Sequence, residues 1–251
     1  MSVDAPVRAL FWMPGCSSCL RLKEFVERTG IKVDEINIDA EPERRAELEQ
    51  VGVWPPAIRV GDRYANGLNL DEVAALLGVE YEAAAPLRPA ELHDRYLAVQ
   101  AVYAKVLTLM PVGYLQRSLP GRDRTMADVA AQVSAVMRAF LAAYETGKHD
   151  NSFYLRPDDV RSVADLRTRA DQTVAMFTAW WEQDGFDDPL DNVVSTFWGH
   201  HTLHEVLERE VWHTTQHLRQ LVYVLDEVGV EHDIDLKPLM VGLPMPERVH
   251  D

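Results

Sequence analysis

Only two cysteines occur in the 251-residue chain, and two serines separate them, as Cys16-Ser17-Ser18-Cys19. Two thiols this close can form a disulfide and reopen it, whereas a structural thiol needs no such spacing. An apolar run ending at Trp12 precedes the pair and helically spaced apolar residues follow it, so Cys16 is expected at a helix N-terminus. Free amide groups and the helix dipole lower a thiol pKa there and favour the thiolate. The pattern predicts a redox-active dithiol; the alternatives are a structural disulfide or half of a zinc site, although no second cysteine pair could complete four thiolate ligands.

Composition and charge narrow the class of protein. The net charge of −15 argues against a nucleic-acid partner, because phosphates require a basic face. No window approaches about 18 uninterrupted apolar residues, so no membrane span is expected. The first residues lack the basic and apolar segments of a signal peptide. We therefore expect a cytoplasmic protein, since a reducing compartment suits a reversible dithiol.

The residue pattern changes near residue 85, which predicts two domains. Residues 1–80 alternate strand-length and helical segments in the order β-α-β-α-β-β-α. Residues 81–88 form a linker rich in Ala, Pro and Glu, and residues 89–251 are helical with a C-terminal tail. The expected fold is an α/β domain followed by an all-α domain.

Four long amphipathic helices are expected after the linker. Their predicted ranges are 89–110, 125–144, 162–181 and 192–228, with a crossover connection over 146–161. Thr125 with Asp128, and Ser162 with Asp165, have the spacing of capping boxes. The last helix is expected to be kinked or interrupted near Gly199. Because four apolar stripes can be buried only against each other, these segments predict a four-helix bundle.

The first domain resembles glutaredoxins of the thioredoxin superfamily over about residues 6–78. The resemblance rests on the strand order and on the segments Phe11-Trp12-Met13-Pro14-Gly15-Cys16-Ser17-Ser18-Cys19 and Trp54-Pro55-Pro56-Ala57-Ile58. It implies that Cys16 is the exposed nucleophile and Cys19 the resolving thiol. It also matches Pro56 to a cis-proline that faces the cysteines. Asn66-Gly67 falls where the family places a glycine pair that helps to bind glutathione.

Several substrate-contacting positions depart from the usual glutaredoxin pattern. Two serines replace the usual proline and aromatic residue between the cysteines, and Trp54-Pro55 replaces Thr-Val. Asn66 replaces one of the paired glycines. Trp12 and Trp54 are candidates to flank the thiols as a substrate surface, with small-core packing as the alternative. Glutathione, another low-molecular-weight thiol and a protein dithiol all stay open as the exchange partner.

The last predicted helix contains more than half of the nine histidines. These are His200, His201, His204, His213 and His217. Glu210, His213 and His217 share one helix face, at spacings of three and four residues. Two imidazoles one turn apart suit a divalent metal, and the alternative is ordinary surface or core histidines. His204 faces roughly the opposite way, so the five histidines cannot form a single cluster.

The second domain, over about residues 89–229, resembles the DinB-like family of helical bundles, which includes S-transferases that use mycothiol or bacillithiol. The resemblance rests on the runs Leu203-His204-Glu205-Val206-Leu207 and His213-Thr214-Thr215-Gln216-His217-Leu218-Arg219-Gln220-Leu221. It implies a metal held by His213 and His217, with a third ligand on the second helix, where Gln132 aligns. Since glutamine is a poor ligand for zinc or nickel, we expect weak or absent metal and a pocket kept for an organic ligand. Glu210 and His93 are the other candidates for the third position.

Together these features predict a thiol–disulfide oxidoreductase module joined to a helical-bundle pocket. The expected activity is reduction or S-transfer of a small molecule with a low-molecular-weight thiol as cofactor. The expected partners are a small thiol or mixed disulfide, and a protein reductant is a further candidate. The alternative is a non-catalytic redox sensor or a protein that binds a small ligand or metal. Catalytic turnover of a small mixed disulfide distinguishes the two, and the sequence identifies neither the substrate nor the oligomeric state.

Overall fold

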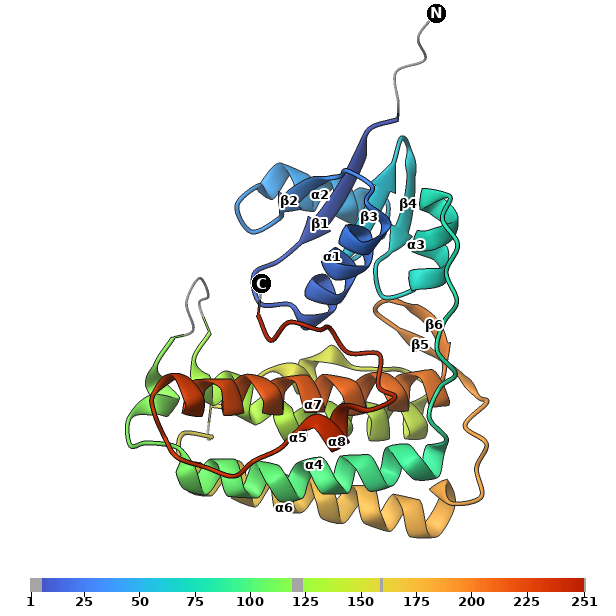
Figure 1. Cartoon of the computed structure of the whole chain (residues 1–251). Helices are drawn as coiled ribbons and strands as arrows, with labels where there is room; N and C mark the ends of the chain where they lie inside the picture. The colour runs from blue at the N-terminus through green and yellow to red at the C-terminus, as the bar shows by residue number, and fades with distance from the viewer. Residues whose placement is uncertain (1–5, 119–123, 159, 251) are drawn as a thin grey trace, which may run out of the picture. The chain divides into compact units, whose positions relative to one another are not determined.

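The chain divides into two compact units, which are described separately below (Figure 1). The computed structural model describes residues 6–118, 124–158 and 160–250. The first unit comprises Met1–Ala85 together with Pro246–Asp251, and the second comprises Pro86–Met245. The division falls within the expected linker, residues 81–88. The last residues of the chain differ from expectation, because they belong to the first unit and not to the helical one.

The first unit has the element order that the sequence predicts. Its elements are β1 (Arg8–Trp12), α1 (Ser17–Thr29), β2 (Asp34–Asn37), α2 (Pro42–Gln50), β3 (Ala57–Val60), β4 (Arg63–Asn66) and α3 (Leu70–Leu77). The strands form one sheet in the order β2-β1-β3-β4, in which β1 and β2 are parallel and the other pairs antiparallel. A parallel pair requires a crossover, and α1 supplies it. The dithiol segment lies at the start of that crossover.

The three middle residues of the central strand β1, Ala9-Leu10-Phe11, are apolar and buried because both faces of the strand are covered. Leu10 packs in a cluster with Leu22 of α1 and Val73 of α3. Phe11 points to the other face and packs in a cluster with Leu48 of α2. Since successive side chains of a strand alternate between faces, a continuous apolar run is the signature of such a buried strand.

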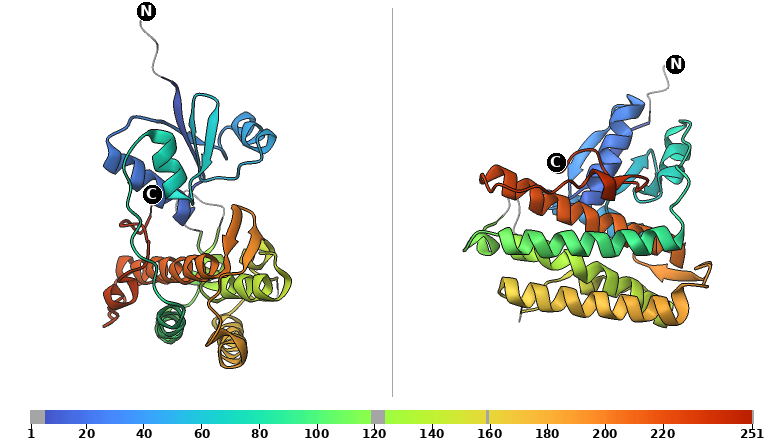
Figure 2. Two further views of the ribbon diagram at one scale, coloured as in Figure 1. Left: turned by 90° about the vertical axis from the view of Figure 1, so that its right-hand side faces the viewer. Right: turned by 60° about the horizontal axis from the view of Figure 1, so that its bottom comes forward.

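The second unit is built on four long helices that pack side by side (Figures 1 and 2). They are α4 (Pro89–Leu109), α5 (Met126–Thr146), α6 (Val163–Trp180) and α7 (Leu203–Glu227). Three short helical turns connect or extend them: η1 (Tyr114–Gln116), η2 (Asn151–Tyr154) and η3 (Trp181–Gly185). The unit also contains a hairpin of β5 (Val193–Thr196) and β6 (Gly199–Thr202), and the short helix α8 (Lys237–Met240). Capping boxes begin α5 at Thr125 and α6 at Ser162, as predicted. The helix starts were therefore encoded locally.

Helices α5 and α6 run in the same direction. Arg138 Nε donates to Thr173 Oγ1 at 2.8 Å, and six residues further along α5 the ring of Tyr144 contacts Trp180, with 5.4 Å between centroids. Consecutive parallel helices need a connection that returns along the bundle, and residues 147–162 provide it. The crossover connection expected over 146–161 is thus present.

Helix α5 is long and apolar enough to cross a bilayer by length and composition alone. Within the described part of the chain it is the one helix that meets those criteria, and 83% of its apolar window is buried inside the structure. Burial of this kind is what a core helix of a bundle requires.

The start of the last long helix differs from the prediction. Residues 193–202 form a hairpin, whereas one helix was expected to run from 192 to 228. Thr202 caps α7 through a reciprocal capping box with Glu205, so the helix begins at Leu203. Gly199 has a φ of 131°, which a glycine adopts readily and a helix cannot contain. His200 and His201 therefore lie on strand β6, and a helical face cannot be assigned to them.

Candidate functional site

The dithiol occupies the N-terminus of α1. Cys16 is the N-cap residue, and its Sγ accepts a hydrogen bond from the backbone N–H of Cys19 at 3.1 Å. Cys16 and Cys19 form a disulfide, with Cα atoms 5.1 Å apart. Cys19 is fully buried, at 0% exposure, whereas Cys16 is partly exposed. An incoming sulfur can therefore reach Cys16 more readily, and the amide of Cys19 is placed to stabilise a Cys16 thiolate.

Three further predicted residues meet at the end of the sheet where β1 leads into the dithiol segment. Phe11 pairs with Ala57, which places Trp12 and Pro56 at the same end of two antiparallel strands. The peptide bond between Pro55 and Pro56 is cis, as predicted. Gly67 N–H donates to the carbonyl of Pro56 at 2.7 Å.

Gly67 has no room for a side chain at this position. A Cβ there would lie 2.5 Å from Leu22 Cδ2 and 2.9 Å from Pro56 Cβ. The neighbouring Asn66 uses its Oδ1 to accept the N–H of Leu68 at 2.9 Å. The two residues thus fix the turn after β4, and their role in substrate binding stays a prediction.

The two tryptophans have different surroundings. The ammonium group of Lys23 lies 3.2 Å from the centre of the Trp12 ring and 3.1 Å from a carboxylate oxygen of Glu35. Lys23 itself is only 8% exposed. Trp54 is 42% exposed, which makes it the more available of the two rings for contact with a ligand. The predicted pairing of both rings as one substrate surface stays a prediction.

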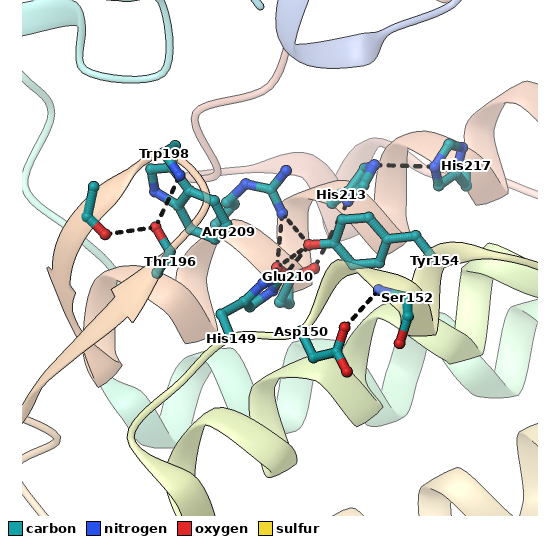
Figure 3. A network of polar contacts seen from close by, with 11 residues as sticks. His149, Asp150, Ser152, Tyr154, Thr196, Trp198, Arg209, Glu210, His213 and His217 are labelled. Atoms are coloured by element: carbon teal, nitrogen blue, oxygen red, sulfur yellow. Dashed lines mark hydrogen bonds and ion pairs between the residues drawn. The ribbon is translucent and has the colours of Figure 1, made fainter. Parts of the chain in front are cut away.

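The second unit contains a buried network of polar side chains centred on Glu210 of α7 (Figure 3). Glu210 is 0% exposed, and its Oε1 accepts hydrogen bonds from Tyr154 Oη at 2.6 Å, Arg209 at 2.7 Å and His149 Nε2 at 3.1 Å. Arg209 also donates to Tyr154 Oη at 2.6 Å, and its guanidinium lies 4.4 Å from the centre of the Trp198 ring. We call Glu210, Arg209, His149 and Tyr154 the Glu210 cluster.

Opposing effects set the ionisation of this cluster. Burial alone would raise the pKa of Glu210, but the charge of Arg209, the hydrogen bond from His149 and the nearby ring of His213 hold that pKa well below its usual value. Burial raises the pKa of Tyr154 far above its usual value. Glu210 and Arg209 thus form a buried ion pair beside a neutral phenol. Since Glu210 can only accept, His149 donates through Nε2, and its buried Nδ1 has no partner among the described residues.

His213 and His217 face each other across one turn of α7. Their Nε2 atoms are 3.1 Å apart, and His217 Nδ1 lies 2.9 Å from Gln220 Oε1. Burial lowers the pKa of His213, and the charge of Arg209 adds to that effect, while Glu210 opposes it. One proton between the rings satisfies both Nε2 atoms, and a metal ion bound by both nitrogens would have to replace that proton.

The structure brings His213 and His217 together but gives neither a third ligand of the expected kind. Gln132 donates its amide N–H to the carbonyl of Tyr154 at 2.7 Å. Glu210 Oε2 lies 3.7 Å from His213 Nδ1, on the ring edge that faces away from His217. Glu210 Oε2 therefore lies behind the ring of His213, farther than hydrogen-bond distance, and not beside the Nε2 atoms that a metal would bind. Within residues 6–118, 124–158 and 160–250, no group of three or more His, Cys, Asp or Glu side chains could hold a metal ion.

The remaining candidate histidines have structural partners. His204 lies 2.7 Å from the carbonyl of Leu87, and Glu208, one turn later, accepts the N–H of Leu87 at 3.2 Å. This row of α7 therefore holds the segment that leads into α4. His93 stacks on Trp181, with 4.4 Å between ring centroids, and packs as an aromatic residue of the bundle.

Sequence reasoning identified Glu210 but missed the other three members of the Glu210 cluster. His149 and Tyr154 lie in the connection between α5 and α6, where no helical or strand periodicity marks a buried face. Arg209 precedes Glu210 directly, so helical spacing places it on a different face. The only available signal was a histidine and a tyrosine inside a crossover connection long enough to return along the bundle.

Comparisons with known proteins place the redox segment in a family. The glutaredoxin family model matches residues 9–65, which contain the dithiol, the cis-proline and strands β1–β4 up to Ala65. No curated protein sequence matches the chain. One solved structure that matches the chain is a mutant of a mycothiol-dependent maleylpyruvate isomerase, at 18% identity and a TM-score of 0.41, covering 54% of this chain and 61% of the isomerase chain. The chain thus spans less than two thirds of that protein. The first unit carries a glutaredoxin domain, and thiol–disulfide exchange is the chemistry that this match indicates.

Proposed function

We propose that the protein is a thiol–disulfide oxidoreductase in which Cys16 attacks and Cys19 resolves. The observation that supports this order is the position of Cys16 as N-cap, with its sulfur accepting the N–H of Cys19 at 3.1 Å. The reduced Cys16 thiolate attacks one sulfur of a mixed disulfide, forms a new S–S bond and expels the other sulfur as a thiolate. Cys19 then attacks Cys16, which closes the internal disulfide and releases the second thiol. Two electrons pass to the substrate, and a low-molecular-weight thiol or a protein dithiol returns them.

Two single substitutions test the order of the thiols. Cys16→Ser should abolish reduction of 2-hydroxyethyl disulfide, whereas Cys19→Ser should retain the first attack and accumulate a mixed disulfide that mass spectrometry detects. The double variant is the matched control for background labelling. In the reduced protein, iodoacetamide should alkylate Cys16 faster than Cys19. Faster alkylation of Cys19 would overturn the assignment.

The helical unit is proposed to be a DinB-like bundle whose pocket binds the small molecule or the thiol cofactor. The Glu210 cluster supports this, because it gathers a charged guanidinium, a carboxylate, an imidazole and a phenol in a fold that could have been closed with apolar residues. Buried ion pairs add little net stability, so such a cluster is a candidate for function. A divalent metal on His213 and His217 is a further, weaker part of the proposal. The cytoplasm is the proposed compartment.

Kinetics with defined thiols test the role of the bundle. The chain is assayed with 2-hydroxyethyl disulfide and glutathione, mycothiol or bacillithiol in turn. Tyr154→Phe should raise KM for the preferred thiol at least threefold and leave the alkylation rate of Cys16 unchanged. If wild type and variant have equal KM values with all three thiols, the bundle does not bind the thiol cofactor through Tyr154, and the proposed roles of Cys16 and Cys19 are unaffected.

A redox sensor is the second candidate, because Cys16 and Cys19 can form a disulfide without turnover. A sensor oxidises once per dithiol and then stops. Multiple turnovers of 2-hydroxyethyl disulfide per chain support the oxidoreductase, and stoichiometric oxidation alone supports the sensor.

A further inference from the structure

The C-terminal segment of the chain is bound by one buried carboxylate of α1. The backbone N–H of Glu247 donates to Glu24 Oε2 at 2.7 Å, and the N–H of Arg248 donates to Glu24 Oε1 at 2.8 Å. Glu24 is 6% exposed, although it lies in the middle of a helix that also carries Cys19. Each carboxylate oxygen thus receives one of two consecutive amides, which fixes both the position and the direction of the segment.

Charged side chains add a second point of attachment. The guanidinium of Arg248 lies 3.3 Å from Glu24 Oε1 and 3.0 and 3.1 Å from the two oxygens of Glu27. Burial alone would lower the pKa of Arg248, but hydrogen bonds to Glu27 and Glu24 raise it. Arg28 adds a longer contact of 3.7 Å to Glu247. Nη2 reaches both oxygens of Glu27 while Nε reaches Glu24, so the guanidinium bridges two carboxylates with two separate nitrogens, which favours arginine over the single nitrogen of lysine.

Glu24 has no other hydrogen-bond donor within the described part of the chain. Lys23 precedes it in α1 but pairs with Glu35 on β2. Burying a carboxylate costs free energy unless hydrogen-bond donors replace the water that it loses. For Glu24 these donors are Glu247 and Arg248. The position of Glu24 therefore makes physical sense only when the segment is bound.

We propose that α1 carries a binding site for a bent, arginine-containing peptide segment, and that the chain's own residues Pro246–His250 occupy it as a clasp. The clasp belongs to the redox unit, which comprises Met1–Ala85 and Pro246–Asp251. Residues 247–249 form a bend, so that two consecutive amides point toward the same carboxylate. Pro246 directly precedes these amides, and its fixed φ lowers the entropy lost on binding. The ligand class is a peptide with two adjacent free amides and an arginine at the second of them.

Hydrogen exchange in the full-length chain tests the clasp. The amides of Glu247 and Arg248 should be protected in the native protein, although both residues lie near the chain end. Glu24→Gln should reduce that protection about tenfold or more, because one side-chain oxygen becomes an NH₂ donor that cannot accept. Glu49→Gln, on the exposed surface of α2, is the matched control and should change nothing.

Trypsin provides a second readout that does not depend on exchange rates. Cleavage after Arg248, followed by mass spectrometry, should be at least tenfold faster in Glu24→Gln than in the wild type and the Glu49→Gln control. The alkylation rate of Cys16 should stay within twofold, because its stabilising amide, that of Cys19, lies in the first turn of α1, five residues before Glu24. Unprotected amides in the wild type, or equal protection and cleavage in both variants, would overturn the clasp. If only the assignment of Cys16 as nucleophile and Cys19 as resolving thiol fails, the clasp proposal is unaffected.

Discussion

Removal of the Glu210 carboxylate gives the sharpest test of the bundle's interior. Glu210→Leu keeps a side chain of similar volume but deletes the acceptor of three hydrogen bonds, from Tyr154, Arg209 and His149. Arg209 then remains as a buried cation, because its side chain is 9% exposed and its charge cannot be lost. An uncompensated buried charge costs about 3–5 kcal/mol.

That free energy sets the expected shift in thermal unfolding. For units of about 150–250 residues, 1 kcal/mol corresponds to roughly 2–4 °C, so Glu210→Leu should lower the Tm of the helical unit by about 6–20 °C. Far-ultraviolet circular dichroism follows the transition, since this unit is mainly helical. Glu227→Leu, on the exposed last turn of α7, is the matched control and should change stability by less than about 0.5 kcal/mol.

A double substitution separates the charge argument from simple loss of packing. Arg209→Met combined with Glu210→Leu removes both charges, so the double variant should be more stable than Glu210→Leu alone by about 2 kcal/mol or more. If the two single effects add without coupling, the ion-pair reasoning is refuted.

The same group predicts a pH dependence. The folded-state pKa of Glu210 is depressed below its usual value of 4.5, despite burial, chiefly by the charge of Arg209. Its stabilising contribution is therefore fully present above about pH 4.5 and is lost as the pH falls toward the folded-state pKa. Urea titrations of wild type and Glu210→Leu should converge in stability at low pH, and parallel curves down to acid unfolding would contradict the argument.

Three other outcomes are expected. Gly67→Ala should destabilise the redox unit by about 1–3 kcal/mol in urea unfolding, because the new methyl group would lie 2.5 Å from Leu22 Cδ2; an unchanged midpoint would show that the turn can shift freely. Purified, dialysed protein should contain well under one equivalent of zinc by elemental analysis, and near-stoichiometric metal that disappears in His213→Ala would count against this. Gln132→His should tighten zinc binding by supplying a third nitrogen; no gain would mean that this position does not face the histidine pair.

Sequence patterns predicted the redox unit well because its determinants are local. The two-face burial of β1 appears as an uninterrupted apolar run, and the strand-to-helix change places Cys16 at the N-cap. In the helical unit, the capping boxes at Thr125 and Ser162 set two helix starts within a residue. Each of these features depends on residues within about four positions of one another.

The failures have the opposite origin. The hairpin before α7 was read as helix because its histidines and apolar residues matched a helical phase, while the glycine conformation and the cap at Thr202 decided the outcome. The partners of Glu24, and the contacts of Glu210 with Tyr154 and His149, were not predictable, since they come from positions more than 50 residues away in the chain. The spacing of residues in the sequence predicts which of them share a face of a helix or strand, but it does not predict which distant segment packs against that face.

The clasp also affects how the protein is made. The hydrogen bond between Glu24 and Glu247 joins positions 223 residues apart, so it cannot form until residue 247 has been synthesised. At synthesis rates of about 5–20 residues per second, the residues between Ala85 and Pro246 take roughly 8–30 s to synthesise. Throughout that interval Glu24 of the nascent glutaredoxin domain lacks the protein donors that it has in the complete unit. A stop codon at position 246 would therefore yield chains with all residues of the bundle and a redox unit without its clasp.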